Sequence, residues 1–163
     1  MTGDGRDDAG VYRWVNGIHQ GDAAETLAEM PESSVHTVVT SPPYFGHRDY
    51  GVEGQIGLED SVADYIQSIV EVADELRRVL RNDGSWWLNL GDTFAGSQNG
   101  RSMTGDTKES QPPEGRPSPG AATLRRKSKM LIPHRVAIAL QDAGWIVRMD
   151  NVWQKTDPIP NPV

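Results

Sequence analysis

The sequence predicts an α/β protein with a mainly parallel sheet, and three observations support that class. Val35–Thr40 is β-branched and apolar almost throughout, which is typical of a strand buried in a parallel sheet. Between Asp60 and Leu80, apolar residues recur at three- and four-residue steps, which indicates an amphipathic helix of about five or six turns. A second strand pattern follows at Ser85–Leu90. Because strands that alternate with helices are joined by crossovers, we expect the sheet to be parallel.

Upstream of these elements, turn signals divide the chain into short pieces. A short strand is expected at Val11–Val15, a short helix at Ala23–Met30 and a turn at Pro31–Ser34. The first buried strand then ends in Ser41-Pro42-Pro43-Tyr44. Because two consecutive prolines cannot continue a central strand, we expect this tetrapeptide to form a loop at the carboxyl end of the strand.

The long helix and the downstream elements also carry boundary signals. Asp60 or Ser61 can cap the start of the helix, and Asn82–Gly84 is expected to stop it. A further helix is expected at about Pro133–Ala143, because proline suits the first turn of a helix. Trp145–Trp153 is predicted to be a third strand or a hairpin arm.

The chain has 163 residues, enough for one domain with a single core. Residues 1–10 are a polar tail without the apolar stretch of a signal peptide. We expect the domain to cover residues 11–163, with a flexible insertion at about residues 91–130. The first part of this insertion, Gly91–Gly120, holds six glycines, four prolines and four serines, which disfavours a regular helix or strand.

The composition excludes several classes of function. There is no cysteine, which removes disulfides, thiolate metal sites and cysteine nucleophiles. The four histidines do not fall at ligand-like spacings, so we expect no metal site. No apolar run approaches the roughly 20 residues that a membrane helix needs. We therefore expect a cytoplasmic protein with no membrane partner.

The net charge is −7, which is unusual for a protein that binds nucleic acid. The basic residues are unevenly placed, however, because residues 115–141 contain six bases and no acidic residue. Their densest part is Arg125, Arg126, Lys127 and Lys129. We interpret these four side chains as contacts for nucleic-acid phosphates, with a solvated loop as the alternative interpretation.

A series of short motifs surrounds the Ser-Pro-Pro-Tyr loop, which by itself is more typical of a rigid turn than of a site. The motifs follow in order over about residues 17–160: Gly21-Asp22, Ser34-Val35, Val38–Tyr44, Gly54–Glu59, Tyr65, Trp87–Asp92, Ile132-Pro133, Gly144-Trp145 and Trp153–Lys155. Together they resemble the site-specific DNA methyltransferases that modify cytosine N4 or adenine N6, in the permuted order whose catalytic half precedes the cofactor loop. The resemblance implies a partial Rossmann-like fold of the S-adenosylmethionine-dependent methyltransferases.

The loop residues suit that chemistry. An exocyclic amine of a base is a poor nucleophile because its lone pair is delocalised into the ring, so a site must hold the nitrogen with acceptors in line with the methyl donor. Ser41 Oγ and the Pro42 carbonyl are suitable acceptors, and Pro42 and Pro43 stiffen the loop. Tyr44 offers a face on which a flipped base can stack. Methylation at cytosine C5 needs a cysteine adduct, so the absence of cysteine excludes that product.

Three further candidates follow strand ends. The resemblance implies that Asp22 contacts the adenine amine or the ribose of S-adenosylmethionine, with a helix cap as the alternative. Asn89 either orients Ser41 or makes a structural hydrogen bond. Asp92, at the same strand end, is the second candidate for contacting or orienting the target base. Because ligands of parallel sheets bind outside the carboxyl ends of the strands, we expect these residues to line one edge with Ser41–Tyr44.

One motif of the family is not matched. The family's cofactor loop reads Phe-x-Gly-x-Gly after an Asp-Pro pair, whereas Asp157-Pro158 is followed by Ile159-Pro160. We therefore expect the N-terminal half of a methyltransferase, as a fragment, a split gene or a decayed copy. The resemblance implies S-adenosylmethionine as cofactor and double-stranded DNA as substrate. A cognate restriction endonuclease and the missing C-terminal half are the further partners that we expect.

The leading hypothesis is a DNA amino-methyltransferase in restriction–modification or phage DNA protection. The serine at the first motif position favours cytosine N4 over adenine N6. The alternative from another class is a catalytically inactive DNA-binding remnant that keeps the base pocket but lacks the cofactor loop. A third hypothesis, methylation of a protein glutamine or an RNA base, is disfavoured by the basic segment and by the long match.

Overall fold

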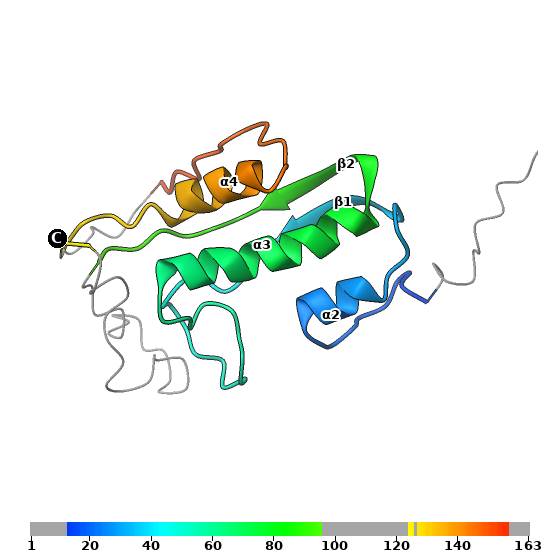
Figure 1. The fold of residues 1–163 in the computed structure, drawn as a ribbon, viewed down its shortest axis with the longest axis horizontal. Helices are drawn as coiled ribbons and strands as arrows, with labels where there is room; N and C mark the ends of the chain where they lie inside the picture. The colour runs from blue at the N-terminus through cyan, green and yellow to red at the C-terminus, as the bar shows by residue number, and fades with distance from the viewer. Residues whose placement is uncertain (1–12, 96–123, 126, 157–163) are drawn as a thin grey trace, which may run out of the picture. The chain divides into compact units, whose positions relative to one another are not determined.

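The computed structural model describes residues 13–95, 124–125 and 127–156. Their elements follow in the order α2 (Ala23–Ala28), β1 (Val35–Thr40), α3 (Val62–Val79), β2 (Leu80–Leu88) and α4 (Ile132–Asp142) (Figure 1). The chain forms two compact units. The sheet unit comprises residues 1–41 and 68–89, and the loop unit comprises residues 42–67 and 90–163. Among the described residues, no helix is long and apolar enough to cross a lipid bilayer.

The predicted α/β class with a parallel sheet is confirmed in the sheet unit, where β1 and β2 pair in parallel. The continuous register runs from Thr37 opposite Ser85 to Thr40 opposite Leu88. The backbone N–H of Asn89 then donates to the Thr40 carbonyl at 2.9 Å and extends the ladder beyond β2. The two strands therefore end together at one edge of the sheet.

The structure differs from the prediction at the start of β2, which begins at Leu80 directly after α3 instead of at Ser85. The register shifts between Val35 and Thr37, so that residues 81–84 form an irregularity within the strand. A Cβ at Gly84 would lie 2.9 Å from the Arg81 carbonyl oxygen, so this irregularity requires glycine. The Asn82–Gly84 turn signal, predicted to stop the helix, therefore lies within β2.

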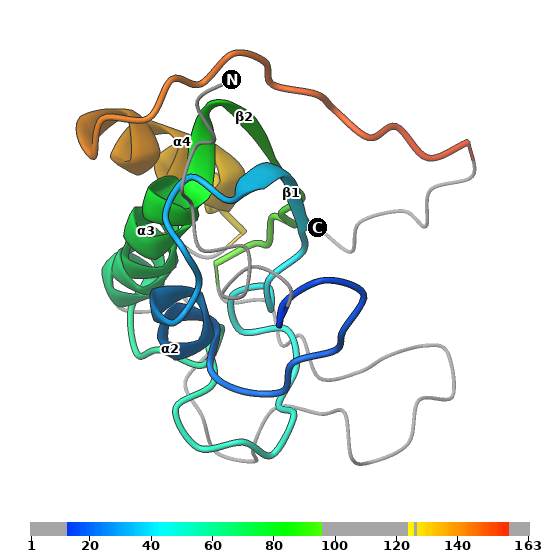
Figure 2. The ribbon, with the colours of Figure 1, turned by 90° about the vertical axis from the view of Figure 1, so that its right-hand side faces the viewer.

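The predicted long helix is confirmed as α3. Ser61, and not Asp60, caps it, because Ser61 Oγ accepts the backbone N–H of Asp64 at 3.1 Å. Its buried side chains recur on one face, as the apolar spacing predicts: Tyr65, Ile69, Ala73, Leu76 and Val79. From Ser68 onward α3 belongs to the sheet unit and lies alongside β1 and β2 in both ribbon views (Figures 1 and 2).

The predicted short helix is confirmed as α2, although it ends at Ala28 instead of Met30. Arg78, near the end of α3, donates from Nη1 to the Met30 carbonyl at 2.8 Å and from Nη2 to the Leu27 carbonyl at 2.6 Å. Its Nε also donates to Glu75 at 3.0 Å. One guanidinium thus holds the carbonyl groups at the end of α2.

In the loop unit, the predicted C-terminal helix is confirmed as α4, with Ile132, Val136 and Leu140 buried. The expected irregular insertion at residues 91–130 has paired ends. Ala95 and Met130 donate their N–H groups to the carbonyls of Ser128 and Thr93 at 2.8 and 2.9 Å. These antiparallel contacts close the base of the insertion, and residues 96–123 lie outside the described residues.

Two predicted strands do not form among the described residues. Residues 13–16 form a turn, and Val11 and Tyr12 lie outside the described part. Trp145–Trp153 pairs with no strand there, and several of its apolar side chains are exposed, with Trp153 at 84%. Both segments have apolar patterns, but a strand also needs an edge to pair with, and the described sheet has only β1 and β2.

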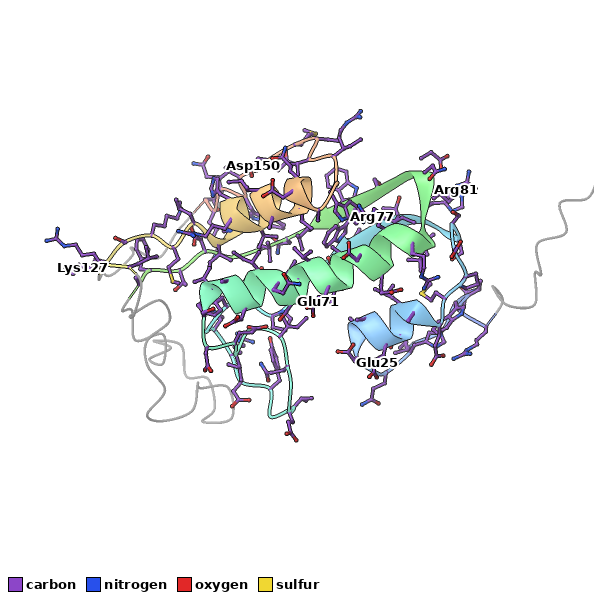
Figure 3. All side chains as sticks on the ribbon, viewed as in Figure 1. Glu25, Glu71, Arg77, Arg81, Lys127 and Asp150 are labelled. Carbon is purple, nitrogen blue, oxygen red and sulfur yellow. The ribbon has the colours of Figure 1, made fainter. Side chains whose placement is uncertain are left out.

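The guanidinium of Arg78 provides a stability test. Replacing Arg78 with alanine leaves the Leu27 and Met30 carbonyls without their charged donor, so we expect the free energy of unfolding to fall by about 2–3 kcal/mol. The matched control is Arg77→Ala, because Arg77 also lies on α3 and its ion pair with Asp74 joins two half-exposed side chains (Figure 3). Urea denaturation should show a change of less than about 0.5 kcal/mol for this control. Equal losses of unfolding free energy in Arg78→Ala and Arg77→Ala would contradict a stabilising role for the Arg78 hydrogen bonds.

Candidate functional site

In the sheet unit, two polar side chains meet at the carboxyl ends of the strands. Ser41 directly follows β1 and Asn89 directly follows β2. Asn89 Nδ2 lies 3.5 Å from Ser41 Oγ, a long hydrogen bond, and both residues are exposed. The neighbouring Thr40 is held by Trp86, whose indole N–H donates to Thr40 Oγ1 at 2.8 Å. The structure therefore brings Ser41 and Asn89 together, as the strand-end argument predicts.

Asp22, also in the sheet unit, caps α2. Its Oδ1 accepts the backbone N–H groups of Ala24 and Glu25 at 2.9 and 3.1 Å. Both cap hydrogen bonds use Oδ1, so Oδ2 takes no part in the cap. The helix-cap interpretation is confirmed, and the contact with a cofactor stays a prediction that this geometry allows.

In the loop unit, Pro42, Pro43 and Tyr44 form the start of an irregular loop, as predicted. The Tyr65 hydroxyl donates to the Pro43 carbonyl at 3.0 Å, and the N–H of His47 donates to the Tyr44 carbonyl at 3.1 Å. Burial, with smaller contributions from Glu59 and Tyr44, raises the pKa of the Tyr65 hydroxyl. Tyr65 therefore stays protonated and remains a donor at neutral pH.

Two glycines of the loop unit lie close to Tyr44. A Cβ at Gly91 would lie 2.6 Å from Cδ2 of the Tyr44 ring, and a Cβ at Gly57 would lie 3.1 Å from the Tyr44 carbonyl oxygen. Gly57 also has a φ of +100°. The ring of His47 is 6.1 Å from the Tyr44 ring, and burial, with a smaller contribution from Arg48, lowers the pKa of this histidine. A neutral imidazole therefore lies beside Tyr44 at neutral pH.

The Asp92 side chain, in the loop unit, accepts hydrogen bonds from two backbone N–H groups. Its Oδ1 accepts the N–H of Thr93 at 2.9 Å and the N–H of Ile132, the first residue of α4, at 3.0 Å. Its Oδ2 lies 3.7 Å from Nζ of Lys129, and the side chain is only 12% exposed. Since Leu131 at the N-cap position offers no side-chain hydrogen bond, Asp92 serves as the cap of α4. A role at the target base stays a prediction.

Three of the four basic candidates lie among the described residues. Arg125 and Lys127 are exposed, and Lys127 points away from the described ribbon (Figure 3). Lys129 lies in the paired base of the insertion and faces Asp92. Arg126 lies outside the described residues. Their contact with phosphates stays a prediction.

Tyr65, Gly57 and Gly91 had no role predicted from the sequence, although all three lie in the matched motifs. A signal for Tyr65 was present, because a buried tyrosine on the apolar face of a helix needs a partner for its hydroxyl. The identity of that partner, 22 residues away, depends on the tertiary structure. The two glycines carry no signal that distinguishes them from ordinary turn glycines.

Comparisons with known proteins give one consistent family. A family model described as DNA methylase, of the N6 and N4 methyltransferase type, matches residues 35–163. The Type II methyltransferase M.SfiI of Streptomyces fimbriatus is 42% identical over 88% of this chain and 31% of its own length. M.XycI of Xanthomonas campestris pv. cyanopsidis, also named a Type II methyltransferase, is 41% identical over 90% of this chain and 48% of its own length.

A third relative, the Type II methyltransferase M.Cfr9I of Citrobacter freundii, is 38% identical over 90% of this chain and 48% of its own length. The chain thus spans about half of the length of M.XycI and M.Cfr9I, and less of M.SfiI. No solved structure matches the chain significantly.

Proposed function

This chain belongs to the DNA methylase family of N6 and N4 methyltransferases, and we propose that it supplies the base-binding half of a methyltransferase acting on DNA. The reaction is the transfer of a methyl group to an exocyclic amine of a flipped base. The observation that carries the proposal is Ser41-Pro42-Pro43-Tyr44 at the carboxyl end of β1, with Asn89 at 3.5 Å from Ser41.

The proposed roles follow from the chemistry of the amine. Ser41 Oγ and the Pro42 carbonyl accept hydrogen bonds from the amine, which favours the tetrahedral nitrogen that attacks a methyl group. Asn89 acts on Ser41 by fixing the orientation of its hydroxyl. The proton that leaves the methylated nitrogen passes to water, because a hydroxyl and a peptide carbonyl accept hydrogen bonds but are too weakly basic to keep a proton. Pro43 stiffens the loop, and Tyr44 stacks on the flipped base.

S-adenosylmethionine is the cofactor that we propose, and it supplies an electrophilic methyl group on a sulfonium. The residues present fit one part of it. Asp22 Oδ2, which the α2 cap does not use, suits the adenine amine or a ribose hydroxyl. The chain lacks a Phe-x-Gly-x-Gly loop, which we assign to the portion of the relatives that this chain does not cover. We propose that this second portion extends the sheet into a Rossmann-like fold.

Several finer features complete the proposal. Serine at position 41 favours cytosine N4 over adenine N6. The Type II names of the relatives support a place in a restriction–modification system, with a cognate endonuclease as partner.

A second candidate function is a DNA-binding remnant without transfer activity. It is supported by the exposed basic side chains of Arg125 and Lys127, which can bind phosphates without methyl transfer.

A radiolabelled methyl-transfer assay tests the proposal. The chain alone is expected to transfer no methyl group to plasmid DNA. The chain combined with the portion of M.XycI outside the aligned region, fused or in trans, is expected to transfer label. In this combination, Ser41→Ala together with Tyr44→Ala should abolish transfer, because both the acceptor and the stacking face are lost.

Matched control variants distinguish the loss of side chains in the proposed site from a general loss of structure. Ser85→Ala together with Tyr50→Ala removes the same two side-chain types from exposed positions outside the proposed site, and should leave transfer near the wild-type rate. If the combined protein binds DNA but never transfers label, the inactive remnant is the better account. Robust transfer by the chain alone would refute the need for a second portion.

The salt dependence of DNA binding tests whether the four basic candidates contact phosphates. Each phosphate contact contributes about −0.9 to the slope of log K against log salt concentration. Replacing Arg125, Arg126, Lys127 and Lys129 with glutamine should therefore flatten the slope of DNA binding by roughly 3 to 4, if all four meet phosphates. Arg77→Gln, on the exposed side of α3, is the single-charge control and should leave the slope unchanged. An unchanged slope in the fourfold variant would contradict the phosphate assignment.

A further inference from the structure

We infer that Tyr65 and Gly91 are positioning residues that fix the backbone and the ring of Tyr44 before a base arrives. The inference deepens the proposed function and rests on it, because Tyr44 is there the residue that stacks on the flipped base. All the contacts that carry it lie within the loop unit. Neither residue is needed to touch the base or the cofactor.

The first contact is the hydrogen bond from Tyr65. Tyr65 is the fourth residue of α3, is fully buried and packs against Phe45 with ring centroids 5.4 Å apart. Its hydroxyl donates to the Pro43 carbonyl at 3.0 Å. Removing this donor would leave the Pro43 carbonyl without its protein partner, so the contact does more than fill space.

This hydrogen bond constrains Tyr44 through the peptide plane. Because the peptide unit is planar, fixing the Pro43 carbonyl also fixes the Tyr44 N–H. On the other side, the Tyr44 carbonyl accepts the N–H of His47 at 3.1 Å. The peptide planes before and after the Tyr44 Cα are thus both held. The direction in which the side chain leaves the backbone is therefore set by Tyr65 and by the turn to His47.

The second contact sets the ring itself. A Cβ at Gly91 would lie 2.6, 2.8 and 3.2 Å from Cδ2, Cε2 and Cγ of Tyr44, so the ring rests directly on the Gly91 backbone. Any side chain at position 91 would push the ring away, because separations below 3.0 Å are not tolerated. Tyr44 is half-buried, and its remaining surface is the part available to a base. A platform held in this way loses little freedom when a base stacks on it.

An NMR measurement on the full chain tests the positioning without DNA. The Tyr44 ring should shift the Gly91 α-proton resonances upfield through its ring current, and Tyr44→Leu should remove that shift. Tyr65→Phe is expected to reduce it, whereas Tyr50→Phe, which removes a hydroxyl from an exposed loop tyrosine, should not. Gly91→Ala, with Tyr65 intact, should displace the Tyr44 ring resonances, whereas Gly17→Ala should not. An unchanged Gly91 shift in Tyr65→Phe would overturn the inference.

Methyl transfer by the combined protein gives the second readout. Tyr65→Phe and Gly91→Ala should each lower kcat about 10- to 100-fold, as expected for misplacement of about 1 Å, with KM for S-adenosylmethionine unchanged. A normal kcat in both variants would overturn a positioning role, even if the NMR shifts moved. If the wild-type combination transfers nothing, the proposed function fails, and the NMR result still decides whether Tyr65 holds Tyr44.

Discussion

Parallel pairing of β1 with β2 brings Ser41 and Asn89 together, because it carries two chain segments almost 50 residues apart to the same edge of the sheet. Hydrogen bonds between backbone groups set the register from Thr37 opposite Ser85 to Thr40 opposite Leu88, and the Asn89 N–H adds one more to the Thr40 carbonyl. Since side chains alternate along a strand, a slip of one residue would reverse the faces of β2 and separate Asn89 from Ser41. The meeting of these two side chains therefore depends on backbone geometry.

Within each unit, single polar side chains anchor backbone groups distant in the sequence. Arg78 holds the end of α2, Asp92 caps α4 across 40 residues, and Tyr65 holds Pro43. Each side chain satisfies a carbonyl or N–H group that local structure leaves without a partner. Contacts from distant residues thus hold these three backbone segments, and the contact from Tyr65 helps to explain how a loop with two prolines presents a defined tyrosine.

These long-range contacts also explain how far prediction from sequence reaches. The strand β1 was predictable from its run of β-branched residues, and the helix α3 from its three- and four-residue apolar spacing, because both signals are local. The start of β2 was not, since its irregularity depends on the close approach of Gly84 to β1, where a Cβ would lie 3.0 Å from the His36 carbonyl oxygen. The apolar pattern of Trp145–Trp153 predicted a strand, but pairing needs a partner edge that the described sheet does not supply. At the site, Ser41 and Asn89 were predictable from strand ends, whereas the roles of Tyr65 and Gly91 depend on tertiary contacts.

The exposed face of the sheet is relevant to the proposed function. Parallel sheets normally have both faces covered, yet Val39 and the register partner Trp87 are exposed on one face of this sheet. This exposure supports our proposal of a second portion, which is also motivated by the coverage of about half of M.XycI and M.Cfr9I. Mass spectrometry of nucleosides from DNA treated with the combined protein identifies the methylated atom. We expect N4-methylcytosine, whereas 5-methylcytosine would show that the methyl group does not go to an exocyclic amine.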